Sequence, residues 1–230
     1  MISKNLSDIK KTIASSAEKA VRNPSDIVLM AVSKTFGAES IRSAYQSGCR
    51  IFGENRVQEA SKKIVSLSDL DINWHLIGHL QKNKINKAVE LFDSIDSVDE
   101  ILTARKISLR AGELGKRIDI CIEVNIGREL QKNGVMPDKL LNFAGEVCDL
   151  ENIKLRGIMA IPPYSPDKEA SRVYFRKMKI LFDKCVAAGI KIDILSMGMS
   201  GDFDIAIEEG ATMIRIGRLI FGNRTTNCLL

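Results

Sequence analysis

Lys34 is the residue whose position could support covalent chemistry. It follows an apolar run, residues 27–32, that has the length of a buried strand, so its amine would be partly desolvated. Desolvation and nearby positive charge lower the pKa of an amine and make it a nucleophile that can form an imine with an aldehyde. A surface lysine that extends its charge into solvent would occupy the same position. The position alone leaves both interpretations open.

A second group of candidate residues lies near the C-terminal end of the chain. Residues 196–202 read SMGMSGD, and Arg215 and Gly217 follow. Small residues allow close approach of the backbone, while the hydroxyls of Ser196 and Ser200 and the N–H groups of a helix start suit a phosphate. The same residues could instead form a turn and a helix cap, with Arg215 in a structural ion pair.

The other polar residues are weaker candidates for a functional site. Glu54 could orient Lys34 or Asn55, or it could face solvent. His75 and His79 lack partners at metal-ligand spacing, and we interpret His75 as a buried barrel histidine. Five cysteines are scattered without CxxC pairs, which predicts neither a disulfide framework nor a metal site: Cys49, Cys121, Cys148, Cys185 and Cys228. Of these, Cys121 and Cys185 lie in apolar runs and are expected in the core.

Composition favours an ordinary soluble protein. The 230 residues are 45% hydrophobic and 27% charged, with a net charge of +5. The densest basic stretch, residues 81–87, has no interleaved aromatics and is interpreted as a solvated helix start, so nucleic acid is not an expected partner. No signal peptide and no run of about 18 apolar residues is present, which predicts a cytoplasmic protein without a membrane partner.

Strands and helices alternate along the chain after a first helix over residues 5–22. Strands are expected at 27–32, 50–53, 73–78, 93–97, 118–124, 155–161, 192–196 and 212–216. Helices follow each of the first seven, and one of them carries the stripe Val98, Ile101, Leu102 and Leu109. Eight such units predict an α/β fold, a single (β/α)₈ TIM barrel with an extra N-terminal helix, forming one domain over 1–230. An open doubly wound sheet is the rival.

In a barrel of this kind, functional groups stand where the strands end, at the C-terminal face. This rule brings one set of residues to a common rim: Lys34, Glu54, Asn55, His79, Asn125, Ser196, Ser200, Arg215 and Gly217. Loops after strands seven and eight are the usual phosphate site of these barrels.

Six blocks in the same order resemble the pyridoxal phosphate homeostasis protein family. They are AVSKT at 31–35, FGEN with VQE at 52–59, WHLIGHLQ at 74–81, RGIMAIP at 156–162, LSMGMS at 195–200, and MIRIG with IFG at 213–222. The blocks span nearly the whole chain. The resemblance implies a barrel similar to the N-terminal domain of alanine racemase.

The resemblance also implies a cofactor and the residues that bind it. Pyridoxal 5'-phosphate would be held as an internal aldimine on Lys34, with Asn55 near the ring. Ser196, Ser200, Arg215 and Gly217 would surround the phosphate. Two features depart from the family: Arg218 stands where threonine is usual, and the loop at 127–134 is poorer in serine, so it is given no role.

The resemblance favours a carrier over an enzyme, and no catalytic residue is assigned. Turnover needs a second acid or base at the substrate carbon, which alanine racemases take from an additional C-terminal domain, whereas this sequence ends at Leu230, shortly after the eighth strand. We expect a monomer that buffers pyridoxal phosphate or delivers it to apo-enzymes requiring it. The alternatives are a racemase or decarboxylase using the cofactor, a lysine Schiff-base aldolase without it, and a barrel that binds no cofactor.

Overall fold

The computed structural model describes residues 1–222, and its centre is a closed barrel of parallel strands. The strands are β1 (Val28–Val32), β2 (Ile51–Glu54), β3 (Asn73–Leu76), β4 (Ser94–Val98), β5 (Ile118–Glu123), β6 (Ile153–Met159), β7 (Ile194–Ser196) and β8 (Met213–Ile216). They follow one another in chain order, and β8 pairs with β1 to close the barrel. The predicted (β/α)₈ barrel is confirmed.

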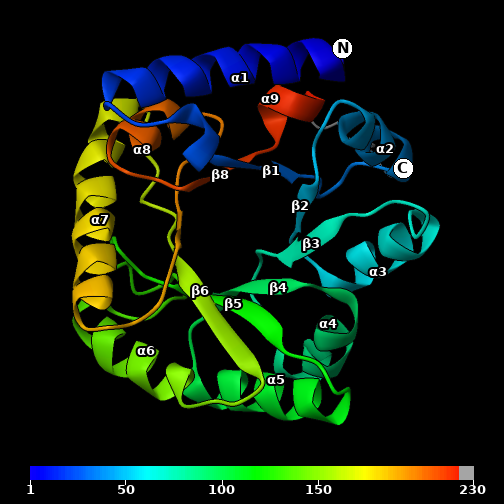
Figure 1. Cartoon of the computed structure of the whole chain (residues 1–230), viewed down its shortest axis with the longest axis vertical. Coiled ribbons are helices and arrows are strands. Elements are labelled where there is room, and N and C mark those ends of the chain that lie inside the picture. The colour runs from blue at the N-terminus through cyan, green and yellow to red at the C-terminus, as the bar shows by residue number, and fades with distance from the viewer. Residues whose placement is uncertain (223–230) are drawn as a thin grey trace.

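Helices surround this barrel, as Figure 1 shows. They are α1 (Ile2–Lys19), α2 (Ala38–Gln46), α3 (Val57–Ser66), α4 (Ile85–Leu91), α5 (Ile101–Glu113), α6 (Leu140–Cys148), α7 (Arg172–Ala187), α8 (Phe203–Glu208) and α9 (Arg218–Phe221). Each crossover between neighbouring parallel strands contains a helix, which is the connection that parallel pairing requires.

The extra N-terminal helix, α1, lies across α8 and α9 (Figure 1). Its residues Leu6, Ile9 and Ile13 are buried at helical spacing, which gives it one apolar face toward the barrel. Asn5 Nδ2 donates to the carbonyl oxygen of Ile220 at 2.9 Å. The N-terminal helix therefore supports the segment that follows β8.

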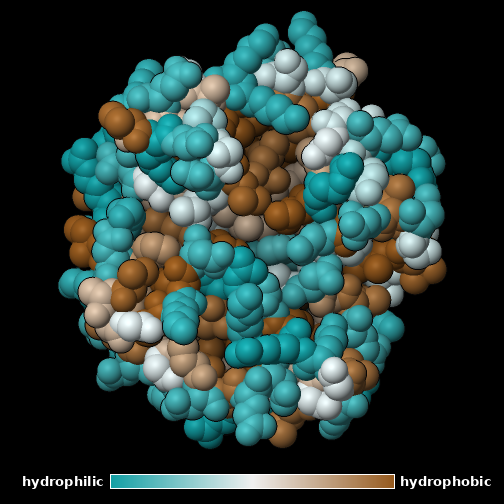
Figure 2. All heavy atoms as spheres, in the orientation of Figure 1, coloured by the Kyte–Doolittle hydropathy of each residue, from teal (hydrophilic) through white to brown (hydrophobic). Residues whose placement is uncertain are grey.

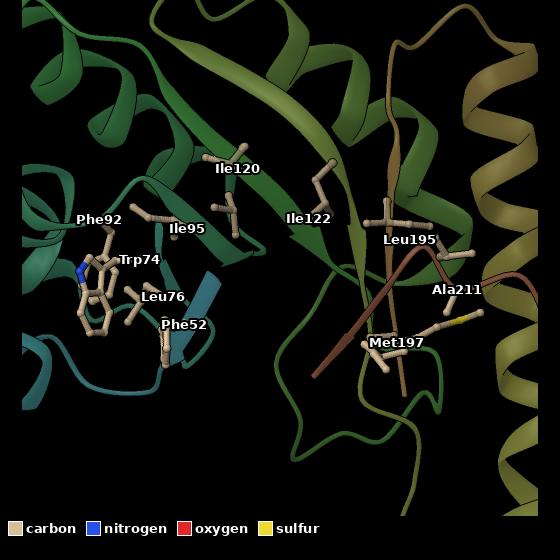
Figure 3. Close-up of a cluster of buried hydrophobic side chains, with 14 of the residues drawn as sticks. Phe52, Trp74, Leu76, Phe92, Ile95, Ile120, Ile122, Leu195, Met197 and Ala211 are labelled. Atoms are coloured by element: carbon tan, nitrogen blue, oxygen red, sulfur yellow. The ribbon is translucent and has the colours of Figure 1, made fainter. Parts of the chain in front are cut away.

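The hydrophobic core outside the barrel lies between the strands and their helices. Figure 3 shows Phe52 and Trp74 together on neighbouring strands, with ring centroids 5.8 Å apart. Leu195 and Met197 lie in the same layer near β7 (Figure 3). Because side chains alternate along a strand, the residues between these positions point into the barrel lumen.

The stripe predicted for the fifth helix is wrong in part. Leu102 and Leu109 are 59% and 69% exposed, and Val98 belongs to β4. The buried face of α5 instead carries Thr103, Ala104, Ile107, Ser108 and Ala111. The helix is therefore rotated so that this mixed face, and not the leucines, packs on the barrel. In α7, Phe175, Met178 and Cys185 are buried on one face.

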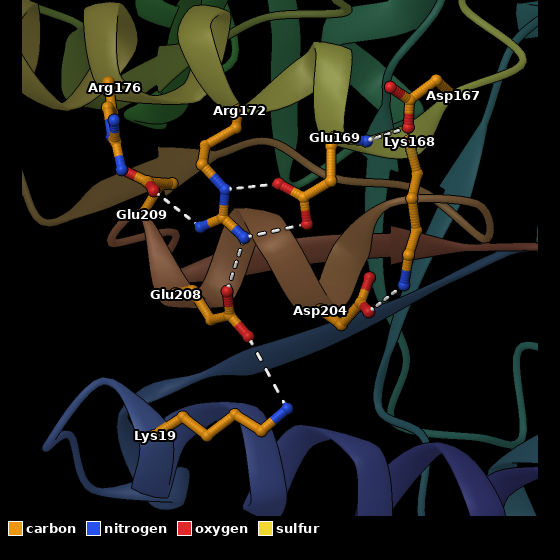
Figure 4. Close-up of polar contacts among 9 residues, drawn as sticks. All are labelled: Lys19, Asp167, Lys168, Glu169, Arg172, Arg176, Asp204, Glu208 and Glu209. Atoms are coloured by element: carbon orange, nitrogen blue, oxygen red, sulfur yellow. Dashed lines mark hydrogen bonds and ion pairs between the residues drawn. The ribbon is translucent and has the colours of Figure 1, made fainter.

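An ion-pair cluster fastens α8 to α7, as Figure 4 shows. Arg172 donates to Glu169, to Glu208 at 2.8 Å and to Glu209 at 2.8 Å. Lys168 pairs with Asp204 at 2.7 Å. The cluster holds the helix that begins directly after the loop at 196–202.

The predicted burial of Cys121 and Cys185 is confirmed, whereas Cys148 is exposed and Cys228 lies outside the described residues. In the described part of the chain, no helix is long and apolar enough to cross a membrane. Over residues 1–222, no group of His, Cys, Asp or Glu side chains has the arrangement of a metal site.

Candidate cofactor site at the barrel rim

Four neighbouring strands bring the predicted site residues to one arc of the rim. Val32 pairs with Gly53 on β2, and Ser33 N donates to the carbonyl oxygen of Gly53 at 3.0 Å, so Lys34 and Asn55 both follow this paired end of the two strands. On the other side, Ala31 pairs with Ile216, which places Gly217 next to the end of β1. Strand pairing therefore sets the end of β1, which Lys34 follows, between the ends of β2 and β8, which Asn55 and Gly217 follow.

The loop after β7 continues this arc. Arg215 N donates to the carbonyl oxygen of Gly198 at 3.0 Å, which fixes the two late loops against each other. Gly198 has a φ of +91°, a conformation that glycine adopts readily. Asp202 Oδ1 accepts from Met199 N at 2.8 Å and folds the loop into a turn that includes Ser200. Ser200 is half-buried at this edge of the barrel.

Lys34 itself is half-buried and lies in a turn with unusual backbone geometry. Phe36 N donates to the carbonyl oxygen of Ser33 at 3.0 Å, and Thr35 has a φ of +71°. The Phe36 ring stacks on Phe221 of α9 with centroids 4.8 Å apart. The loop that carries the lysine is thus joined by side-chain packing to the segment after β8.

Ser196 and Arg215 lie lower, inside the barrel lumen. Both are buried, and Arg215 Nη1 donates to Ser196 Oγ at 2.6 Å while Nη2 donates to the carbonyl oxygen of Ala160 at 2.9 Å. Burial lowers the pKa of Arg215, while carboxylates across the lumen, first Asp96 and then Glu123, act in the opposite direction. Arg215 therefore places a fixed positive charge beneath the rim.

The lumen carries further titratable groups that were not predicted as site residues. Glu123 has its pKa raised to about 7 because it is mostly buried and faces Asp99. His75 is buried, and its Nδ1 lies 2.8 Å from Asp96 Oδ2. Burial disfavours a charged imidazole, but the Asp96 carboxylate outweighs it, so the pKa of His75 is raised. The interpretation of His75 as a buried barrel histidine is confirmed.

Glu54 neither reaches solvent nor stands alone. It is fully buried, accepts from Ser33 Oγ at 2.6 Å and from Lys63 Nζ at 2.8 Å. Burial raises the pKa of Glu54, while Lys63 and Ser33 oppose that rise. Lys63 is a further residue that the sequence does not single out; its spacing of four from Glu59 is typical of an exposed helical pair.

Two cavities flank the lumen. One of about 590 Å³ lies at the rim, against Asn55, Gly78, His79 and the start of α3. The other, of about 330 Å³, lies at the opposite end, where Val28 and Asn73 begin β1 and β3. Figure 2 shows one face of the molecule with a hollow below the position of α9, where apolar atoms lie within a hydrophilic border.

The residues present fit a phosphorylated aldehyde. An amine stands at Lys34, a hydroxyl at Ser200 and an arginine charge beneath them. A Cβ atom added at Gly217 would lie 3.2 Å from the carbonyl oxygen of Val32, so glycine permits a close approach of the two loops. One arc of the rim thus combines a nucleophile with groups able to hold an anion.

The comparisons define the class of protein. A family model described as alanine racemase, N-terminal domain, matches residues 5–225. The pyridoxal phosphate homeostasis protein of Aquifex aeolicus is 43% identical over 220 residues, covering 95% of this chain and 96% of the relative. The chain belongs to this family of pyridoxal phosphate homeostasis proteins, with the barrel of the alanine racemase N-terminal domain.

Solved structures agree. The PipY protein of Synechococcus elongatus with PLP bound is 37% identical, with a TM-score of 0.85, covering 96% of this chain and 100% of that chain. An alanine racemase from Clostridium difficile in complex with cycloserine is 18% identical, with a TM-score of 0.75, covering 96% of this chain and 61% of that chain. The racemase shares the fold, and the family resemblance inferred from the six sequence blocks is confirmed.

Proposed function

We propose that this protein binds pyridoxal 5'-phosphate covalently through Lys34 and serves its homeostasis by buffering or delivering it. The observation that carries the proposal is that β1, which Lys34 follows, pairs with β2 and β8, the strands that Asn55 and Gly217 follow. Membership of the pyridoxal phosphate homeostasis family and the likeness to PipY, whose structure has PLP bound, support it.

Each rim residue has a proposed role. The bound cofactor supplies an aldehyde carbon that a lysine amine can attack. Asn55 would orient the ring, while Ser200 and the backbone of Gly217 would hold the phosphate. Ser196 and Arg215 would face the bound phosphate from inside the lumen, where their side chains are hydrogen-bonded to each other. Arg215 would contribute its positive charge toward the bound anion.

We further propose a carrier without turnover. The relatives are named homeostasis proteins, not enzymes. Glu54 and Glu59, which accept hydrogen bonds from Ser33 Oγ and Thr35 N on either side of Lys34, both also accept from Lys63 and hold the loop in place. We propose in addition that residues 1–230 form one domain, that the protein is a cytoplasmic monomer, and that apo-enzymes requiring the cofactor receive it.

Two assays on the loaded protein separate a carrier from an enzyme. In the first, single enantiomers of amino acids are incubated with it, and optical rotation and carbon dioxide release are followed. In the second, a cofactor-free aminotransferase is added and its recovery of activity is measured. A carrier restores the aminotransferase and leaves the amino acids unchanged. Sustained racemisation or decarboxylation would establish an enzyme, and no transfer would contradict delivery.

A further inference from the structure

A largely buried polar network contacts the two chain neighbours of Lys34, Ser33 and Thr35. We call Glu54, Glu59 and Lys63 the Lys63 network. Lys63 Nζ donates to Glu54 Oε1 at 2.8 Å, to Glu59 Oε1 at 2.6 Å and to the carbonyl oxygen of Ser33 at 2.9 Å. Ser33 Oγ donates to the same Glu54 oxygen at 2.6 Å. The residue before Lys34 is therefore fixed through both its side chain and its carbonyl group.

The residue after Lys34 is held by the same network. Glu59 Oε1 accepts from Thr35 N at 2.6 Å. Thr35 has a φ of +71°, in the left-handed region, where a β-branched residue is a conformational outlier that needs compensation. The short bond from a carboxylate is the compensation that the structure offers. Both peptide neighbours of Lys34 are thus tied to helix α3.

Stability alone does not account for this network. Lys63 is 8% exposed and Glu54 is fully buried, and a buried ion pair commonly stabilises a fold no better than apolar residues of the same size. Glu54 Oε2 is also buried without a hydrogen-bond partner. The contacts that the network does make converge on Ser33 and Thr35. The network therefore supports the backbone on either side of Lys34.

We propose that the Lys63 network is a positioning device: it fixes the backbone at Ser33 and Thr35 so that the Lys34 amine meets the aldehyde carbon in a productive orientation. The inference rests on the proposed function. In the step it serves, the Lys34 nitrogen adds to the aldehyde carbon and a carbon–nitrogen double bond replaces the carbon–oxygen double bond. The aldehyde oxygen leaves as water with the two amine protons.

The main test compares rates of covalent capture. Apo-protein is mixed with pyridoxal phosphate or with pyridoxal, which lacks the phosphate, and the growth of the visible absorption band is followed. Glu59→Ala, whose side chain is half-buried and so spares the core, should slow capture of both aldehydes by about tenfold to a hundredfold, since a small misplacement of a reacting group costs about this much. Equal losses for the two aldehydes would show that phosphate binding is intact.

The Thr35→Gly variant tests whether Glu59 acts by holding the backbone at residue 35. Thr35→Gly removes the conformational strain at a positive φ, so Glu59→Ala introduced on Thr35→Gly should lose no more than about threefold in rate. A merely structural role for Glu59 would show no such rescue. The double variant Glu54→Gln with Lys63→Met tests the buried part of the network and should slow capture by a similar factor. Thermal unfolding of each apo-variant is measured in parallel.

Matched controls change the same residue types away from the rim. Glu113→Ala and Lys179→Met each break an exposed helical ion pair and should leave the capture rate unchanged. Two results would overturn the inference while leaving the proposed function intact. One is a folded Glu59→Ala protein that captures the aldehyde at the wild-type rate. The other is a loss of capture rate from Glu59→Ala that is as large in the Thr35→Gly background as in the wild type. Absence of capture at Lys34 in the wild-type protein would instead overturn the proposed function.

Discussion

Replacing Glu123 by glutamine should change how the stability of the apo-protein depends on pH. Burial, and after it the nearby Asp99, raises the pKa of Glu123 from its ordinary 4.5 to about 7, with Arg215 opposing the rise. Between these two values the folded protein holds more protons than the unfolded chain. Its free energy of unfolding therefore falls as the pH rises, and this contribution is fully present only below the ordinary pKa.

The size of the effect follows from the shift. Each pKa unit corresponds to about 1.4 kcal/mol, so ionising Glu123 in the folded protein costs at most about 3 kcal/mol. Glutamine has nearly the same shape as the protonated acid but does not ionise. Glu123→Gln should therefore match the wild type at about pH 4 and exceed its stability by up to about 3 kcal/mol at about pH 8.

Urea unfolding of the apo-protein across this pH range measures the difference directly. Glu113→Gln, at an exposed position on α5 beside Arg110, is the control and should give a small difference. A stability difference for Glu123→Gln that is constant with pH would refute the reasoning, because it would show that Glu123 ionises alike in the folded and unfolded states. A gain in the stability of Glu123→Gln that is found only at acidic pH would contradict the predicted direction of the pH dependence.

Two further predictions concern the barrel and its outer helices. Gly157→Ala should destabilise the protein by about 3 kcal/mol in urea unfolding, because the new methyl group would collide with the carbonyl group of Ile194 on the neighbouring strand; an unchanged midpoint would contradict this packing. Arg172→Met should cost about 1 kcal/mol at low salt and less at high salt, because its three carboxylate partners are partly solvated; a cost independent of salt would contradict the electrostatic origin.

The barrel could be predicted from the sequence because parallel strands buried on both sides leave apolar runs. The strand at 27–32 was expected one residue longer than β1 (Val28–Val32), and the strand at 155–161 lies two residues earlier, as β6 (Ile153–Met159). These offsets arise because hydrophobicity marks burial, whereas strand ends depend on pairing with neighbours. The exposure of Leu102 and Leu109 could not be anticipated, because α5 carries apolar residues on more than one face and only the fold shows that Ala104 and Ile107 are the buried ones.

The residues that follow the strand ends were predictable from the sequence, whereas the polar contacts that support Lys34 from α3 were not. Strand ends set Lys34, Asn55 and Gly217 at a common face once the barrel was assumed. Lys63 could not be identified, because a lysine four residues after a glutamate on a helix normally faces solvent. Its burial depends on Glu54 from a different element, and only the folded structure shows that the two meet.

The most direct test of the whole account is the identity of the lysine that captures the cofactor. Protein loaded with pyridoxal phosphate is reduced with borohydride, digested and mapped by mass spectrometry, with Lys34→Ala treated in parallel. If Lys34 binds the cofactor, the label will lie on the peptide containing Lys34, and Lys34→Ala will lack the visible absorption band. A label on another lysine, or an unchanged band in Lys34→Ala, would contradict this assignment.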